Sequence, residues 1–175
     1  MQFFTVNNNT VPILHLKPST IDLNVPNRAD NTEVVQSPCK DVECLIMQME
    51  GFSAKPVYCG GHAIGYGRAV YKSKVQYYKN NPVTRQVALN MLREDLDKKR
   101  NQVKQLFITA NLNSNQIDAL SSIAYNTGFY SFKKKALVNK ISNGKKVNEQ
   151  DFINTICPSY QKKYRGLVKR RKAEY

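Results

Sequence analysis

The residues best suited to chemistry lie in one short stretch, from Glu50 to Gly67. Glu50 ends a segment in which apolar side chains recur at helical spacing, and a glycine-rich segment follows it. A carboxylate at the carboxyl end of a helix lies at the negative end of the helix dipole, which disfavours the anion. A carboxyl group that keeps its proton suits general acid catalysis, and glycosidases use one to protonate the leaving oxygen of a sugar bond. Position alone also leaves open a solvated surface glutamate.

The elements around this stretch predict a helix followed by a small sheet. Val42, Leu45, Ile46 and Met49 share one helical face, so we expect a helix over 41–50 that stops at Gly51. The segment 57–79 is rich in Tyr, Val and Gly, which predicts a twisted antiparallel sheet with tight turns. The chemistry-bearing residues therefore lie where a helix meets a sheet.

The rest of the chain predicts helices. Thr84 is a candidate N-cap for a long amphipathic helix that ends near Ala110. Further helices are predicted over 115–126, 134–143, 149–156 and 166–174. The order predicts an α+β fold with a small antiparallel-sheet lobe, a larger helical lobe and a cleft between them. Such a cleft is the usual place for a site.

Residues 1–40 differ from the remainder and carry four of the seven prolines, which predicts a loop-rich N-terminal arm. We expect the folded domain to span 41–175. The start of the chain lacks the basic region, unbroken apolar core and cleavage site of a secretory signal. We therefore expect synthesis in the cytoplasm without a signal peptide.

Composition limits the partners. The chain has 175 residues and a formal net charge of +14, which favours polyanions such as nucleic acid, an acidic membrane or a bacterial envelope polymer. We find no helix-turn-helix, ribonucleoprotein-like or finger pattern, so we do not expect a nucleic-acid partner. No apolar run approaches the roughly 20 residues of a membrane helix, so stable membrane insertion is not expected. The four cysteines match no common zinc spacing, and we expect neither metal nor cofactor.

The stretch from Glu50 to Gly67 resembles the phage-type lysozymes, or endolysins, of glycoside hydrolase family 24. The resemblance rests on Glu50-Gly51-Phe52, eight residues between Glu50 and Cys59, and Ile64-Gly65-Tyr66-Gly67. Ordered segments continue it from about residue 41 to 174, at 83–96, 112–132, 137–144 and 166–174. It implies a lysozyme-like fold and a monomeric peptidoglycan hydrolase that causes bacterial lysis, acting on the cell wall after release or delivery.

By this resemblance, Glu50 is the general acid that protonates the oxygen between N-acetylmuramic acid and N-acetylglucosamine. Cys59 takes the place of the second catalytic residue, which is Asp or Cys in the family. Its thiol would need a cationic neighbour to ionise at neutral pH, and a small packed side chain or a disulfide partner is the alternative. Ala63 stands where the family has Thr. His62 is the candidate replacement, with an exposed strand histidine as the alternative.

Four further residues match supporting positions of the family. Tyr66 and Asn126 match residues near the sugar path, although Tyr66 could instead pack in the sheet and Asn126 could serve a turn. Arg68 stands where the family has a His in a structural ion pair. Arg170 matches an arginine that braces the catalytic helix, with a solvated basic helix as the alternative.

The departure at Ala63 leaves two other functions open. A lytic transglycosylase needs only one acid/base, because the substrate's own hydroxyl attacks, and would use Glu50 alone. A catalytically impaired relative would bind peptidoglycan without cutting it.

Overall fold

A computed structural model describes residues 41–175, and the arm predicted over 1–40 lies outside the described residues. Helix α1 (Val42–Glu50) leads into an antiparallel sheet of β1 (Ser53–Tyr58), β2 (His62–Gly65) and β3 (Arg68–Val70), in the order β1-β2-β3. The helices that follow are η1 (Lys72–Lys74), α2 (Val75–Asn80), α3 (Arg85–Leu106), α4 (Ser114–Thr127), α5 (Phe129–Phe132), α6 (Ala136–Ser142), α7 (Glu149–Ile153), α8 (Pro158–Lys163) and α9 (Arg165–Glu174).

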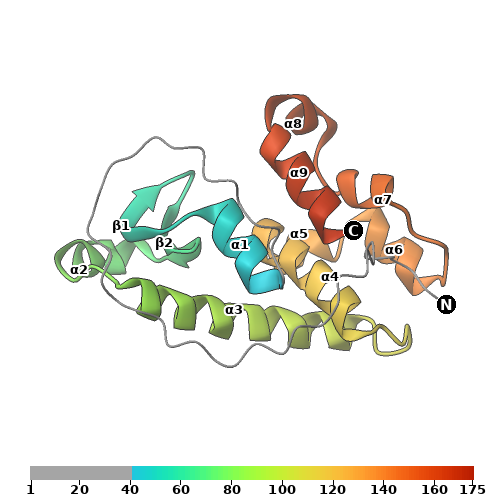
Figure 1. The fold of residues 1–175 in the computed structure, drawn as a ribbon, viewed down its shortest axis with the longest axis horizontal. Coiled ribbons are helices and arrows are strands. Elements are labelled where there is room, and N and C mark those ends of the chain that lie inside the picture. The colour runs from blue at the N-terminus through green and yellow to red at the C-terminus, as the bar shows by residue number, and fades with distance from the viewer. Residues whose placement is uncertain (1–40) are drawn as a thin grey trace, which may run out of the picture.

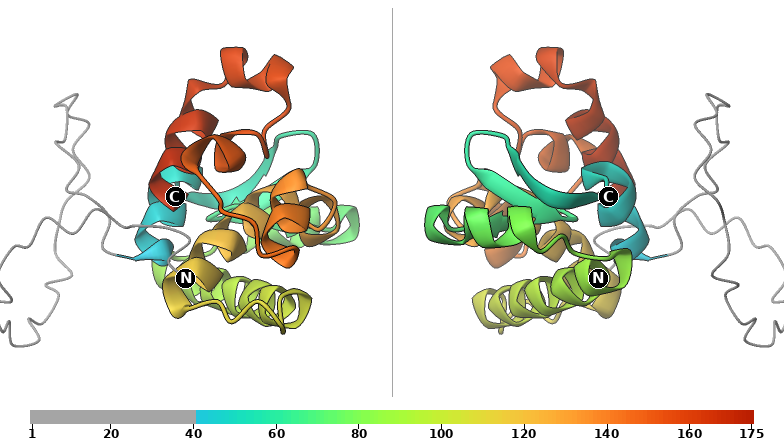
Figure 2. Two further views of the ribbon diagram at one scale, coloured as in Figure 1. Left: turned by 90° about the vertical axis from the view of Figure 1, so that its right-hand side faces the viewer. Right: turned by 90° about the vertical axis from the view of Figure 1, so that its left-hand side faces the viewer.

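The predicted α+β architecture, with a sheet lobe and a larger helical lobe, is confirmed. Figure 1 shows the sheet and α2 at one end of the molecule, the helices from α4 to α9 at the other, and α3 running beneath both. Two further views in Figure 2 show α8 and α9 rising above the sheet and the long helix. Among residues 41–175, no helix is both long and apolar enough to cross a bilayer.

Helix α3 joins the two lobes because its buried face contributes to both cores. Ala88, Leu92 and Leu96 pack with Ile46 and Ile64 of the sheet lobe. Its last turn and its C-cap contribute to the helical core through Val103 and Phe107, whose neighbours are Leu120, Ile123, Ala124, Phe132, Leu137, Val138, Ile141, Val147 and Phe152. A 22-residue helix is roughly 33 Å long, which is enough to span both cores.

Caps fix where the main helices begin. The predicted N-cap is confirmed, because Thr84 Oγ1 accepts a hydrogen bond from the Val87 amide at 3.2 Å. Asn113 and Gln116 form a capping box at the start of α4, in which each side chain bonds the other's backbone amide. These caps set the first residues of α3 and α4, two helices that pack against each other.

One segment predicted as sheet is helical. Strand pairing ends at Val70, and residues 72–80 form η1 and α2 instead of further strands. The buried Val75 and the half-buried Tyr78 are three positions apart, so in a helix both face the sheet lobe. Packing of one apolar side therefore outweighs the strand preference of Tyr and Val. The sheet also begins earlier than predicted, at Ser53.

Candidate active site

Glu50 is placed by the packing of α1. Asp41 caps the helix by accepting a hydrogen bond from the Cys44 amide at 2.7 Å, and the buried Val42 and Ile46 anchor its inner face. Gly51 ends the helix with φ of 70°, a conformation that favours glycine. The side chain of Glu50 keeps 25% of its surface exposed, so its carboxylate can meet both protein and solvent.

The Glu50 carboxylate is held on two sides by different lobes. Arg170 of α9 donates from Nη1 to Oε1 at 2.5 Å. On the other side lies Gly67, between β2 and β3, where an added Cβ would come within 3.3 Å of Oε2 and 3.4 Å of Cδ. Glu50 therefore lies at the junction of the two lobes, and the close backbone approach explains the small residue at 67.

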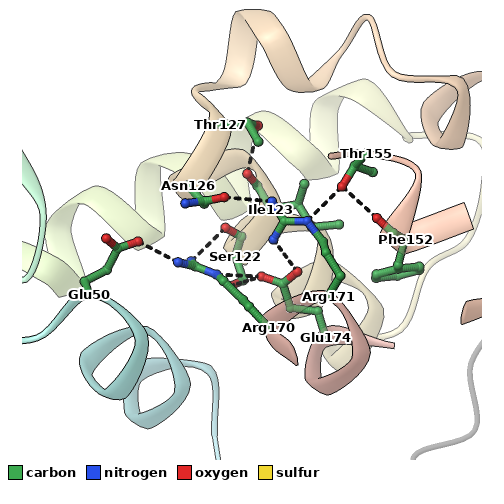
Figure 3. A network of polar contacts seen from close by, with 10 residues as sticks. All are labelled: Glu50, Ser122, Ile123, Asn126, Thr127, Phe152, Thr155, Arg170, Arg171 and Glu174. Carbon is green, nitrogen blue, oxygen red and sulfur yellow. Dashed lines mark hydrogen bonds and ion pairs between the residues drawn. The ribbon is translucent and has the colours of Figure 1, made fainter. Parts of the chain in front are cut away.

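Arg170 is itself buried and fully engaged. Its side chain is 2% exposed, and besides Glu50 it donates from Nε to Glu174 Oε1 at 3.0 Å and from Nη2 to the carbonyl oxygen and hydroxyl of Ser122 at 3.2 Å each. The Ser122 hydroxyl in turn donates to Glu174 Oε1 at 2.6 Å. Figure 3 shows this chain of contacts running from Glu50 into the helical lobe.

Arg171 extends the network on its other side. It donates from Nη1 to Glu174 Oε2 at 2.6 Å, from Nε to Thr155 Oγ1 at 2.8 Å and from Nη2 to Asn126 Oδ1 at 2.7 Å. Burial lowers the pKa of Arg171, and the charge of Glu174 opposes that shift. In the part of the chain that the structure describes, every buried side-chain nitrogen and oxygen has a hydrogen-bond partner. The network therefore holds its members in fixed positions.

The structure thus brings together Glu50, Arg170 and Asn126. Asn126 joins the network through Arg171, because its amide oxygen accepts a hydrogen bond from that guanidinium. Glu174, Arg171 and Gly67 were not identified from the sequence. The spacing of Arg170, Arg171 and Glu174 was the available signal, because residues three and four apart on a helix can form ion pairs.

Cys59 and His62 lie at the tip of the β1–β2 hairpin. The Cys59 amide closes the turn on the Gly61 carbonyl at 2.7 Å, and Cys59 is exposed. His62 packs edge-on against its cross-strand partner Tyr58, with ring centroids 5.3 Å apart. Neither side chain hydrogen-bonds or ion-pairs with Glu50 within residues 41–175. The packed alternative for Cys59 is wrong, because its side chain is exposed.

Tyr66 is a correction to the predicted substrate residues. It is only 8% exposed, its ring packs 5.7 Å from that of Phe52, and its carbonyl accepts a hydrogen bond from the Tyr125 hydroxyl at 2.8 Å. Burial raises the pKa of Tyr125, as do the negative charges of Asp95 and Glu50. The ring of Tyr66 therefore belongs to the core of the sheet lobe and offers little surface to a ligand.

Arg68 joins β3 to α3. Its guanidinium bonds Asp95 at 2.7 and 2.9 Å, Glu94 at 2.9 Å and the Met91 carbonyl at 2.6 Å. Partial burial acts to lower its pKa, but the hydrogen bonds to Asp95 and Glu94 outweigh it and the pKa is raised. This cluster fixes the last strand, and with it Gly67, against the long helix.

Two observations concern other kinds of site. Within residues 41–175, no group of three or more His, Cys, Asp and Glu side chains is arranged to hold a metal ion. A pocket of about 230 Å³ lies at the α3–α4 connection, lined by Lys104, Phe107, Ile108, Asn111, Leu112 and Ile117. It shares no residue with the Glu50 network.

Comparison with known proteins agrees with this arrangement. Residues 47–174 match the family model described as phage lysozyme. The chain is 30% identical over 128 residues to the endolysin of Bacillus phage PZA, covering 73% of this chain and 47% of that protein. It therefore spans about half the length of this curated relative.

Two solved structures share the fold. The muramidase domain of SpmX from Asticaccaulis excentricus has a TM-score of 0.54 and 21% identity, over 79% of this chain and 94% of that one. An endolysin from Escherichia coli O157:H7 phage FAHEc1 has a TM-score of 0.53 and 19% identity, over 80% and 91%. With the family model matching most of its length, the chain belongs to the phage lysozyme family.

Proposed function

We propose that this chain is a peptidoglycan hydrolase that cleaves the glycosidic bond between N-acetylmuramic acid and N-acetylglucosamine. Membership of the phage lysozyme family supports the class of reaction. The observation that carries the proposal is the carboxylate of Glu50, which is fixed by Arg170 and Gly67 at the junction of the lobes and is still 25% exposed. We place the glycan in the expected cleft along this junction, bound to a single copy of the chain.

In this proposal Glu50 acts as the general acid. Its carboxyl proton passes to the glycosidic oxygen while the bond from that oxygen to the sugar C1 breaks, and positive charge develops on the ring. Arg170 Nη1 donates to Glu50 Oε1, so substrate binding must loosen this contact for that oxygen to face the glycosidic oxygen. Water then adds to C1, and its proton returns to Glu50 or to a second group.

We assign the second role to the β1–β2 hairpin, through Cys59 or His62. Both side chains are partly or fully exposed, which a group that positions water requires. Ala63, which pairs with Val57 and Ala69 in the sheet, has no hydroxyl with which to orient a water molecule. Asn126 is proposed as a glycan contact through its amide nitrogen, because its oxygen already accepts from Arg171.

A lytic transglycosylase is the second candidate, and one observation favours it. The other carboxylate of the network, Glu174, has a side chain with no exposed surface and cannot touch a substrate. Glu50 is then the one carboxyl of this network available to a glycan. A mechanism with a single acid/base, in which the sugar's own C6 hydroxyl attacks C1, fits that arrangement. A relative that binds peptidoglycan without cutting it is the outcome if neither reaction occurs.

The basic charge supports an anionic polymer as the surroundings of the substrate. Clusters at Lys133–Lys135, Lys145–Lys146 and Lys162–Lys163 add positive charge to the helical lobe. Bacterial walls carry carboxylate and phosphate groups, so attraction to them should weaken as salt rises. We propose that the chain acts at the cell wall, where this polymer and the glycan occur together.

Digestion of purified peptidoglycan tests the proposal. The parent chain and Glu50→Gln are compared by mass spectrometry of soluble products, with Glu149→Gln as a charge-matched control because Glu149 is an exposed partner of Lys172. Reducing-end products from the parent and the control but not from Glu50→Gln support a hydrolase. Products lighter by one water indicate a transglycosylase. Binding without products from any folded variant would overturn both enzymatic readings.

A further inference from the structure

We propose that Arg171 and Glu174 are positioning residues that control, through Arg170, how strongly Glu50 holds its proton. The inference deepens the proposed function and rests on it only for the effect on turnover. It concerns groups that no substrate reaches, because the side chains of Arg170, Arg171 and Glu174 are 2%, 1% and 0% exposed. Figure 3 shows Glu50 to one side of the α9 side chains, and its side chain is 25% exposed.

The first step is the balance of charge. The connected network holds two guanidinium groups and two carboxylates, so it is neutral when Glu50 is ionised. Protonation of Glu50 leaves one positive charge in excess. Because water screens the three α9 side chains poorly, adding or removing one buried charge changes the proton affinity of Glu50 more than a surface charge does.

The second step is the way Arg170 is shared. Its Nε bonds Glu174 while its Nη1 bonds Glu50, so two carboxylates divide one cation. Glu174 also receives the Ser122 hydroxyl and the Nη1 of Arg171, which leaves it fully engaged. Removing the charge of Glu174 makes Glu50 the remaining carboxylate partner of Arg170 and favours its anion. Removing the charge of Arg171 leaves two carboxylates, Glu50 and Glu174, with Arg170 as their one cation. The network then carries a net negative charge, which favours a proton on Glu50.

The other groups near Glu50 do not offset these effects. From α4, Tyr125 presents a neutral phenol whose pKa is raised by burial. Arg68 on β3 is engaged by Asp95 and Glu94 of α3, and the charges of this cluster are the same in every variant. From the loop between the strands, Gly67 presents only backbone. On α1 itself, Glu43 is paired with Arg93 of α3. Arg170 is therefore the cation in direct contact with Glu50 in the described part of the chain.

Glu174→Gln and Arg171→Gln should shift the titration midpoint of Glu50 in opposite directions, and this difference is the basis of the test. The carboxyl titration of Glu50 is followed by carbon NMR in protein with labelled glutamate, using Glu50→Gln to identify the signal. In Glu174→Gln the midpoint should fall by about one pH unit or more, and in Arg171→Gln it should rise by a similar amount. The double variant restores the balance of charge and should return toward the parent. Glu149→Gln, which removes an exposed carboxylate, should leave the midpoint in place.

A loosened structure would not produce opposite shifts, so shifts of the same sign, or none, in folded variants would overturn the proposal. If Glu174→Gln does not fold, Arg171→Gln and Arg171→Lys decide it, because only the glutamine removes charge and should raise the midpoint. The pH profile of peptidoglycan digestion gives a second readout, whose alkaline limb should move with the NMR midpoint. Opposite NMR shifts in a chain without turnover would retain this inference and refute the proposed function. Turnover without opposite shifts would refute this inference and retain the proposed function.

Discussion

Replacing Gly67 by alanine should reduce both stability and activity, and the loss of activity should be specific to this glycine. Gly67 has φ of +93°, a conformation that costs an L-residue about 1–2 kcal/mol. In a domain of this size such a loss lowers Tm by about 2–8 °C. The new Cβ would also lie 3.3 Å from Glu50 Oε2, which is a few tenths of an ångström too close, so the carboxylate must move. Since a misplacement of about 1 Å can reduce a rate roughly 100-fold, we expect a loss of about tenfold.

Gly144→Ala is the matched control for this prediction. Gly144 also has positive φ, of +63°, but an added Cβ there meets no atom within 4 Å. Both variants should therefore lose similar stability in thermal unfolding followed by circular dichroism, while only Gly67→Ala digests peptidoglycan more slowly, by about tenfold. Equal rates for the two variants, at matched folded fractions, would refute the reasoning that Gly67 fixes the position of Glu50.

Three further predictions concern stability and reactivity. Arg68→Met should lower the free energy of unfolding by about 2 kcal/mol in denaturant titration, because the partly exposed Asp95 loses its main partner; a change below about 0.5 kcal/mol would contradict this. Burial raises the pKa of Tyr125 on folding, so the neutral phenol contributes fully to folding stability below about pH 10, and this contribution is lost at higher pH. Tyr125→Phe should therefore lose less stability than the parent as the pH rises into the alkaline range. A hydrogen bond to Ser159 lowers the pKa of the exposed Cys157 thiol, and Ser159→Ala should slow its alkylation at pH 7, with an unchanged rate as the contrary result.

Local signals in the sequence predicted most of the helices. Thr84 and the apolar stripe after it identified α3, because capping and one-sided burial act within a few residues. The segment 71–79 was predicted wrongly, since Tyr and Val favour strands in general while here Val75 packs one side of a short helix onto the sheet lobe. The choice depended on a tertiary contact that composition does not contain.

The site could be predicted only in part. Physical reasoning from the sequence made Glu50 a candidate without excluding a solvated glutamate. The family resemblance supplied its role as the acid and also Arg170, which lies 120 positions away. The spacing of Glu174 from Arg170 and Arg171 permits ion pairs but does not show that the glutamate is buried. Its burial follows from the docking of α9 on α4 and α7. Tyr66 was predicted as a substrate residue with packing in the sheet as the open alternative, because a tyrosine near a strand can face either the core or the solvent. Its burial in the structure supports the alternative.

The separation of 120 positions between Glu50 and Arg170 also has a consequence in time. A ribosome that adds about 5–20 residues per second needs roughly 6–24 seconds to pass from one to the other. For most of that interval α1 and the sheet have already been synthesised, while Arg170, which binds the Glu50 carboxylate, has not. The contact between Glu50 and Arg170 therefore forms only after α9 has been synthesised and has docked. A chain halted before that point contains Glu50 without Arg170.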